Sequence, residues 1–159
     1  MNAGKIAVIM LLGAAVLTGA LVYYMQMFGY YDEVDQTLGT ESLVVTTTDG
    51  NLQPLSVSDF HGIDKDSSPL GWRACFTLDA APANAQPYPN PTPLVGPNWF
   101  RCYSARGITG DLESGAVRAV LSQHNIRTGI DRVIAIYPDG RAFGWHQLND
   151  EAEEQRLIE

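Results

Sequence analysis

The feature that most constrains this chain is an uncharged, apolar run near its N-terminus, residues 6–28. As a helix this run spans about 34 Å, enough to cross the ~30 Å hydrocarbon core of a bilayer. Because hydrocarbon offers no partners to backbone amides, a helix is the conformation that satisfies them there. The sequence therefore predicts a transmembrane anchor over residues 1–31, with the membrane as one partner of the chain.

Charged and aromatic residues beside this run predict its orientation. Lys5 precedes it, whereas Asp32, Glu33 and Asp35 follow it. By the positive-inside rule we expect an inner-membrane protein with a cytoplasmic N-terminus and a periplasmic domain. Aromatic residues gather at the C-terminal end of the run, as in interfacial belts: Tyr23, Tyr24, Phe28, Tyr30 and Tyr31.

The alternative for this run is a cleaved signal peptide, with a weak small-residue cleavage pattern at Thr18-Gly19-Ala20. The run exceeds the roughly 7–15 apolar residues of a signal-peptide core, which favours an uncleaved anchor. Ala15 and Gly19 lie on one face of the helix, and small residues at this spacing let a second helix approach closely. They are the predicted contact with a partner's membrane helix.

The net charge of −8, from 10 basic and 18 acidic residues, is unevenly distributed. Residues 36–149 carry ten acidic and eight basic side chains and are nearly neutral, so the excess acid lies on either side of them. Binding to nucleic acid needs clustered Lys and Arg to neutralise phosphates. The composition therefore argues against a nucleic-acid partner.

Local patterns predict a small α+β periplasmic domain at residues 42–149, between an acidic juxtamembrane linker at 32–41 and an acidic tail at 150–159. We expect about four to six strands, one main helix and a C-terminal β-hairpin. Thr109 as N-cap predicts that the helix runs to about His124. Strands are predicted at 42–48, 52–60, 72–78, 99–104, 131–137 and 141–148, with a polar loop at 61–70.

Residues 79–98 hold six of the nine prolines, which excludes a helix or a central strand. We expect an extended, polyproline-like segment. Loops of this length either bind partners or are mobile surface segments, and both readings stay open. The candidate partner-binding residues are Pro87, Tyr88, Pro89, Pro91, Pro93 and Trp99.

Cys75 and Cys102 lie in similar contexts, WRACF and WFRCY. In an oxidising periplasm they predict a structural disulfide, worth about 3.5 kcal/mol in the chain-entropy model. The alternative is a thiol or copper site, since soft thiolates suit Cu(I). A thiol site is disfavoured because the chain lacks the C-x-x-C motif of redox dithiols. A copper site would need His61, His124 or His146 to bind the metal together with both thiolates.

The chain contains none of the motifs that mark a nucleophile elbow, a zinc protease, a phosphate loop or a dinucleotide site. The sequence therefore predicts no catalytic residue, no cofactor and no metal. Trp145-His146-Gln147 is the most suggestive polar and aromatic group in the chain.

Four longer stretches are distinctive: SPLGWRACFTL at 68–78, PLVGPNWFRC at 93–102, LESGAVRAVL at 112–121 and GIDRVIAIYPDGRAFGWHQLN at 129–149. They resemble an uncharacterised family of short alphaproteobacterial proteins with one N-terminal membrane helix and one domain of unknown function. The resemblance covers nearly the whole chain, includes both cysteines, and implies no catalytic residue.

Two functions fit these observations. The first is a non-enzymatic, membrane-anchored accessory or assembly component of an inner-membrane complex, which contacts a membrane-protein partner through its helix or its proline-rich segment. The second is a thiol- or copper-handling protein that uses Cys75 and Cys102.

Overall fold

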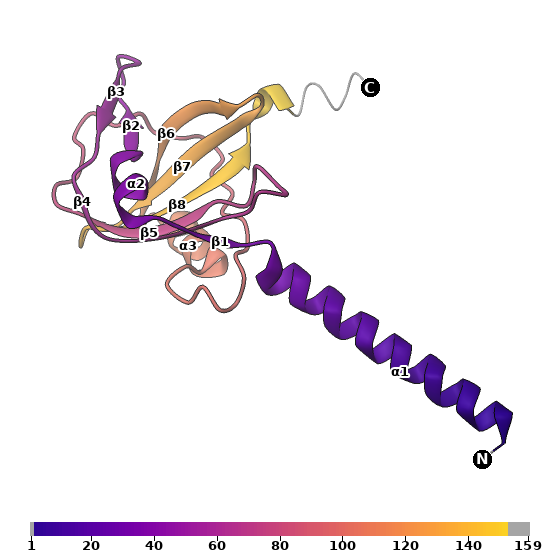
Figure 1. Ribbon diagram of the computed structural model, residues 1–159. Coiled ribbons are helices and arrows are strands. Elements are labelled where there is room, and N and C mark those ends of the chain that lie inside the picture. The colour runs from indigo at the N-terminus through magenta and orange to yellow at the C-terminus, as the bar shows by residue number, and fades with distance from the viewer. Residues whose placement is uncertain (1, 153–159) are drawn as a thin grey trace.

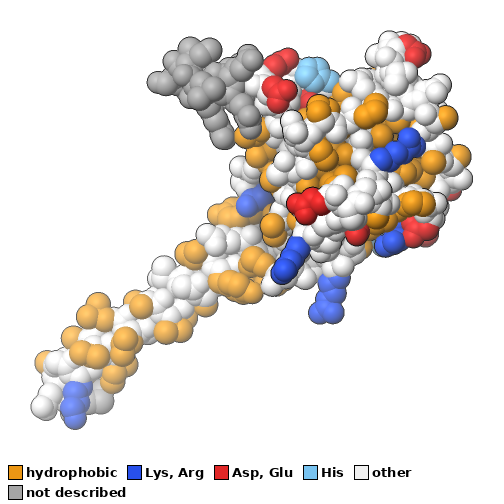
Figure 2. Space-filling model, turned by 180° about the vertical axis from the view of Figure 1, so that it is seen from behind, with side chains coloured by type: hydrophobic (Ala, Val, Ile, Leu, Met, Phe, Trp, Pro, Cys, Tyr) orange, Lys and Arg blue, Asp and Glu red, His pale blue; other side chains and the backbone are white. Residues whose placement is uncertain are grey.

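The computed structural model describes residues 2–152 and joins a long N-terminal helix to a mixed α+β domain (Figure 1). Helix α1 (Ala3–Tyr24) continues into a π-helical turn, η1 (Met25–Gly29), and buries none of its residues. Together they are long and apolar enough to cross a membrane, as predicted. Figure 2 shows apolar side chains along the visible face of this helix.

A six-stranded antiparallel sheet forms the centre of the domain, in the order β1-β4-β5-β8-β7-β6. The predicted C-terminal hairpin is present, and Gly140 has the positive φ (90°) that its turn requires. The strands are β1 (Asp32–Val34), β4 (Val57–Asp64), β5 (Arg73–Leu78), β6 (Arg118–Arg127), β7 (Ile130–Ile136) and β8 (Arg141–Leu148).

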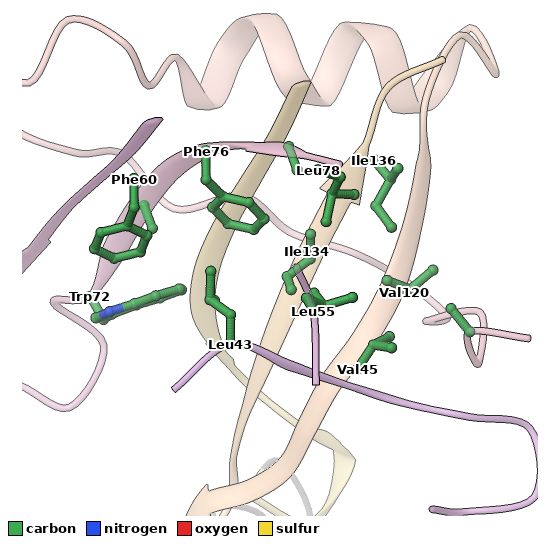
Figure 3. Close-up of a cluster of buried hydrophobic side chains, with 13 residues drawn as sticks. Leu43, Val45, Leu55, Phe60, Trp72, Phe76, Leu78, Val120, Ile134 and Ile136 are labelled. Atoms are coloured by element: carbon green, nitrogen blue, oxygen red, sulfur yellow. The ribbon is translucent and has the colours of Figure 1, made fainter. Parts of the chain in front are cut away.

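One face of the sheet is covered by helix α2 (Gln36–Glu41) and the hairpin of β2 (Val44–Thr46) and β3 (Leu52–Pro54). The hairpin turns at Asp49-Gly50, as predicted, with φ of 81° at Gly50. Figure 3 shows the buried side chains between these layers, among them Leu43, Val45, Leu55, Phe60, Trp72, Phe76, Leu78, Val120, Ile134 and Ile136.

The opposite face is covered by helix α3 (Ala105–Glu113) and the chain that leads into it. The sheet is therefore the middle of three layers, and Trp145 is fully buried within the second core. The buried members of that core are Cys75, Tyr103, Ile108, Val117, Ala119, Val133, Ala135 and Trp145.

The predicted helix from Thr109 to His124 is wrong at both ends, because α3 begins at Ala105 with Ser104 as its N-cap and ends at Glu113. Gly115, with φ of 74°, follows the end of α3, and the chain then forms β6. Val117 and Ala119 pack into one core and Val120 into the other. A strand buried on both faces lacks the alternation that distinguishes a strand from a helix, which explains the error.

Other boundaries also differ from the predictions. Residues 99–104 are turns rather than a strand, and residues 61–64 belong to β4 rather than to a loop. The predicted linker at 32–41 contains β1 and α2, so the folded part begins almost directly after η1. Residues 2–152 form eight strands, more than expected. Of the predicted tail only residues 150–152, a helical turn, are described.

Candidate functional site

The proline-rich segment passes from one face of the sheet to the other around the edge strand β6. The amide of Gln86 donates to the carbonyl of Thr46 at 2.8 Å, and the amide of Tyr88 donates to Ala119 at 3.0 Å. In return, Leu121 donates to the carbonyl of Gln86 at 2.9 Å. Residues 79–98 form neither a helix nor a regular strand, and the segment protects the edge of β6 by pairing with it between Pro87 and Val120.

Gln147 on β8 holds the middle of the segment. Its Oε1 accepts from the amide of Thr92 at 2.7 Å and from Nε1 of Trp145 at 2.9 Å, and its Nε2 donates to the carbonyl of Asn90 at 3.3 Å. Because both polar atoms of this buried side chain are engaged, residues 90–92 have a defined position against the sheet.

Arg73 on β5 holds the following residues. This side chain is 3% exposed, and its guanidinium donates to four backbone carbonyls. They belong to Leu94 and Val95 in the segment and to Leu70 and Trp72 before it. Burial lowers the pKa of Arg73 below its ordinary value, and the carbonyls satisfy its donors without a carboxylate partner.

Cys75 and Cys102 form the predicted disulfide, with their Cα atoms 6.3 Å apart. Cys75 lies on β5, as expected, but Cys102 lies in the turn before α3. His61 pairs with Cys75 across β4 and β5, whereas His124 and His146 have other partners. Within residues 2–152, no group of three or more potential ligands is arranged to hold a metal ion.

A groove of about 540 Å³ lies between the proline-rich segment and the sheet. The segment contributes one wall, with Tyr88, Pro89, Asn90, Thr92 and Leu94. The opposite side is formed by residues at the ends of β6, β7 and β8, including His124, Asp131, Gln147, Leu148 and Asn149. Two of the predicted partner-binding residues, Tyr88 and Pro89, therefore line the groove.

The buried carboxylate of Asp131 organises this end of the groove. Its Oδ1 accepts from Nδ1 of His124, the amide of Asn125 and Nδ2 of Asn149, each at 2.9 Å. Its Oδ2 accepts from the hydroxyl of Tyr88 at 3.1 Å. Burial and the neighbouring carboxylate raise the pKa of Tyr88, so its hydroxyl remains a donor.

An aspartate that orients an exposed histidine is also found in general-base catalysis. Here, however, the two lining side chains with hydroxyls both donate within the domain, Tyr88 to Asp131 and Thr92 to Asn90. His124 has no nucleophile paired with it among the described residues.

His146 is a structural residue on the other face. Its ring stacks on Trp72 with centroids 4.9 Å apart, its Nε2 accepts from Arg132 at 3.1 Å, and its Nδ1 donates to Pro69 at 2.9 Å. Burial, followed by the charge of Arg132, lowers the pKa of His146 to about 3. The ring therefore stays neutral near pH 7 and is no acid–base group.

Pro87, Pro91 and Pro93 belong to the same wall segment but do not line the groove, whereas Trp99, Ala15 and Gly19 lie outside it. Trp99 contacts the end of the N-terminal helix, where its ring stacks on Phe28 and its Nε1 donates to the carbonyl of Met27. Ala15 and Gly19 lie on the exposed helix α1, and no atom outside the helix approaches within 4 Å of where a Cβ on Gly19 would be.

A model for a family of unknown function (DUF6446) matches residues 42–156. The chain belongs to this family. The match covers the groove and the disulfide of this DUF6446 member and begins after β1 and α2. Neither the curated proteins nor the solved structures contain a match to it.

Sequence reasoning missed the partnership of Asp131, His124 and Tyr88, and the role of Arg73. These residues are brought together by the pairing of β6 with β7 and by the path of the proline-rich segment. Gln147 belongs to the polar and aromatic group that the sequence marks on the last strand. No local motif marks the others.

Proposed function

We propose that this protein is a non-enzymatic, membrane-anchored accessory or assembly component, and that its groove holds an extended segment of a membrane-protein partner. The observation that carries this proposal is the immobilised proline-rich segment, which forms one wall of an open groove. A surface held by Gln147, Arg73 and the disulfide loses little conformational entropy when it binds a ligand.

The composition of the groove supports a particular kind of segment. Leu70, Leu94 and Leu148 supply apolar surface, whereas Asp150 and Glu151 lie at its edge with the buried Asp131. No Lys or Arg lines the groove among the residues that the structure describes. A partner segment with one basic side chain between apolar ones therefore complements it.

Charge distribution and disulfide support a location in the inner membrane with the domain in the periplasm. Lys5 precedes the helix, and acidic residues follow it, which favours a cytoplasmic N-terminus. The Cys75–Cys102 disulfide is stable in an oxidising compartment and rare in the cytosol.

Photo-crosslinking in the intact membrane tests this function. A benzophenone amino acid replaces Thr92 in the groove wall or, as a control, Asn51 at the turn of the β2–β3 hairpin. We expect the Thr92 position alone to give an adduct with an integral membrane protein. Glu151→Lys should weaken that adduct several-fold, whereas Glu41→Lys on α2 should not.

Equal adduct yields from both positions, or an adduct yield that Glu151→Lys does not change, would contradict the groove as the binding site. A chain that gives no adduct from either position at native expression would count against a protein partner.

A second candidate function is copper or thiol handling, favoured by the exposed His61 opposite Cys75 in the sheet. After reduction this site would offer two thiolates and one imidazole to Cu(I). We expect the reduced protein to retain one equivalent of Cu(I), and the His61→Ala variant to retain less. If the Cys75→Ser/Cys102→Ser variant retains as much copper as the reduced wild type, this function is wrong.

A further inference from the structure

We infer that the loop before α3 rests on the phospholipid headgroups of the bilayer that holds α1. The surface consists of Val95, Trp99, Arg101 and Arg106 and is named here the headgroup face. Its ligand is the lipid surface itself, so the inference needs no protein partner and stands apart from the groove.

The first step is that the helix and the domain have almost no chain between them. The helical turn η1 ends at Gly29, and β1 begins at Asp32, which pairs with Asp64 of β4. The intervening Tyr30 and Tyr31 are held by Lys65, whose Nζ lies 5.3 Å from each ring centroid. The domain therefore has little freedom to move away from the end of the helix.

The second step is that Trp99 packs on that end. Its ring stacks on Phe28 with centroids 6.2 Å apart, lies edge-on to Tyr31 at 6.2 Å, and its Nε1 donates to the carbonyl of Met27. Trp and Tyr are enriched at the depth of lipid headgroups because their rings are apolar and their edges polar. Trp99 brings the loop to the same depth.

The third step is the exposed surface beside Trp99. Val95 is 81% exposed, more than any large apolar residue of α1. Arg101 and Arg106 are exposed and form no salt bridge with any described residue. An exposed valine gains no hydrophobic stabilisation in water, whereas contact with the bilayer removes its side chain from water. The guanidinium groups of the two arginines can hydrogen-bond to lipid phosphates.

The overall arrangement agrees with these contacts. Figure 1 shows α3 and the loop before it on the side of the domain from which α1 leaves, level with the last turns of that helix. Figure 2 shows basic side chains on the part of the domain next to the helix. The acidic residues at this end, Asp32 and Glu33, lie on a different element, the edge strand β1.

Spin-label depth measurements on the full chain in phosphatidylcholine–phosphatidylglycerol nanodiscs test this inference. No cysteine in the described residues is free, so Val95→Cys introduces a single labelling site, and Asn51→Cys is the matched control. We expect a several-fold higher ratio of oxygen to nickel-chelate accessibility at position 95, because oxygen partitions into lipid and the chelate does not. Arg101→Gln/Arg106→Gln should lower that ratio, whereas Arg127→Gln at the end of β6 should not.

Brominated lipids provide an independent measurement. Trp72 and Trp145 are buried in the domain, so quenching should act on Trp99 and disappear in Trp99→Phe. If the label at position 95 is as accessible to the nickel chelate as the label at position 51, the headgroup face is wrong. That result would leave the photo-crosslinking test of the groove unaffected, so the two proposals fail separately.

Discussion

At the scale of single residues, Arg73 connects the sheet to the proline-rich segment. Arg73→Met keeps much of the side-chain volume but removes the donors to four buried or half-buried carbonyls. We expect the free energy of unfolding to fall by about 2–4 kcal/mol, because those carbonyls lose their partner. Urea unfolding of the full chain in detergent measures this.

The control for Arg73 is Arg127→Gln, which changes an exposed arginine at the end of β6. An equal loss in both variants would contradict the role of Arg73.

His146 makes stability depend on pH. Its pKa is about 3 in the folded protein and 6.5 in a model peptide, so the unfolded chain binds a proton first as the pH falls. Between these values the free energy of unfolding therefore falls with decreasing pH, by up to about 1.4 kcal/mol per pH unit. His146→Gln should flatten this dependence.

Carboxylates also titrate in the lower part of that range, so the measured quantity is the difference between wild type and His146→Gln. If the two proteins show parallel stability curves from pH 6.5 to pH 4, the pKa of His146 is the same in the folded and the unfolded state, and this prediction is wrong.

At the scale of elements, the disulfide stabilises the layer formed by the proline-rich segment and α3. Replacing Cys75 and Cys102 by Ala should lower the free energy of unfolding by about 3.5 kcal/mol in the chain-entropy model. Hydrogen exchange should increase most in residues 88–103 and least in the β7–β8 hairpin. A uniform increase over both regions would contradict a local role.

Elements with a local signal were predictable from the sequence. Pro138-Asp139-Gly140 between two runs rich in β-branched and aromatic residues marked the β7–β8 hairpin, and proline density excluded a helix or a central strand over residues 79–98. Residues 118–127 were not predictable in the same way, because they are buried on both faces of the sheet by layers distant in sequence. Trp99 and Phe100 gave a pattern typical of a strand. In the structure Trp99 stacks on Phe28 of η1, and Phe100 lies edge-on to Trp99.

The residues of the candidate site also differ in whether a local sequence signal marked them. The cysteine pair carried a signal in its two similar contexts, WRACF and WFRCY, and Tyr88 carried one in the surrounding prolines. Asp131 and His124 did not, because their hydrogen bond exists only after β6 pairs with β7.

At the scale of the whole molecule, α1 and the domain should move as one body. A six-residue Gly-Ser insertion between Tyr31 and Asp32 adds a flexible tether. We expect a fluorescent label at Asn51→Cys to report the slow rotation of the nanodisc in the uninserted chain and faster rotation after the insertion. Identical anisotropy decays for both chains would contradict a rigid junction.

The order of strands in the sheet has a consequence for biosynthesis. β8 is the last strand along the described chain, yet it lies between β5 and β7 in the sheet. A nascent chain that has emerged only as far as β7 therefore leaves the inner edge of β5 unpaired, and unpaired edges invite aggregation. Both cysteines emerge earlier, so their disulfide can form before the sheet closes. The domain completes its fold only after residues 141–148 have emerged.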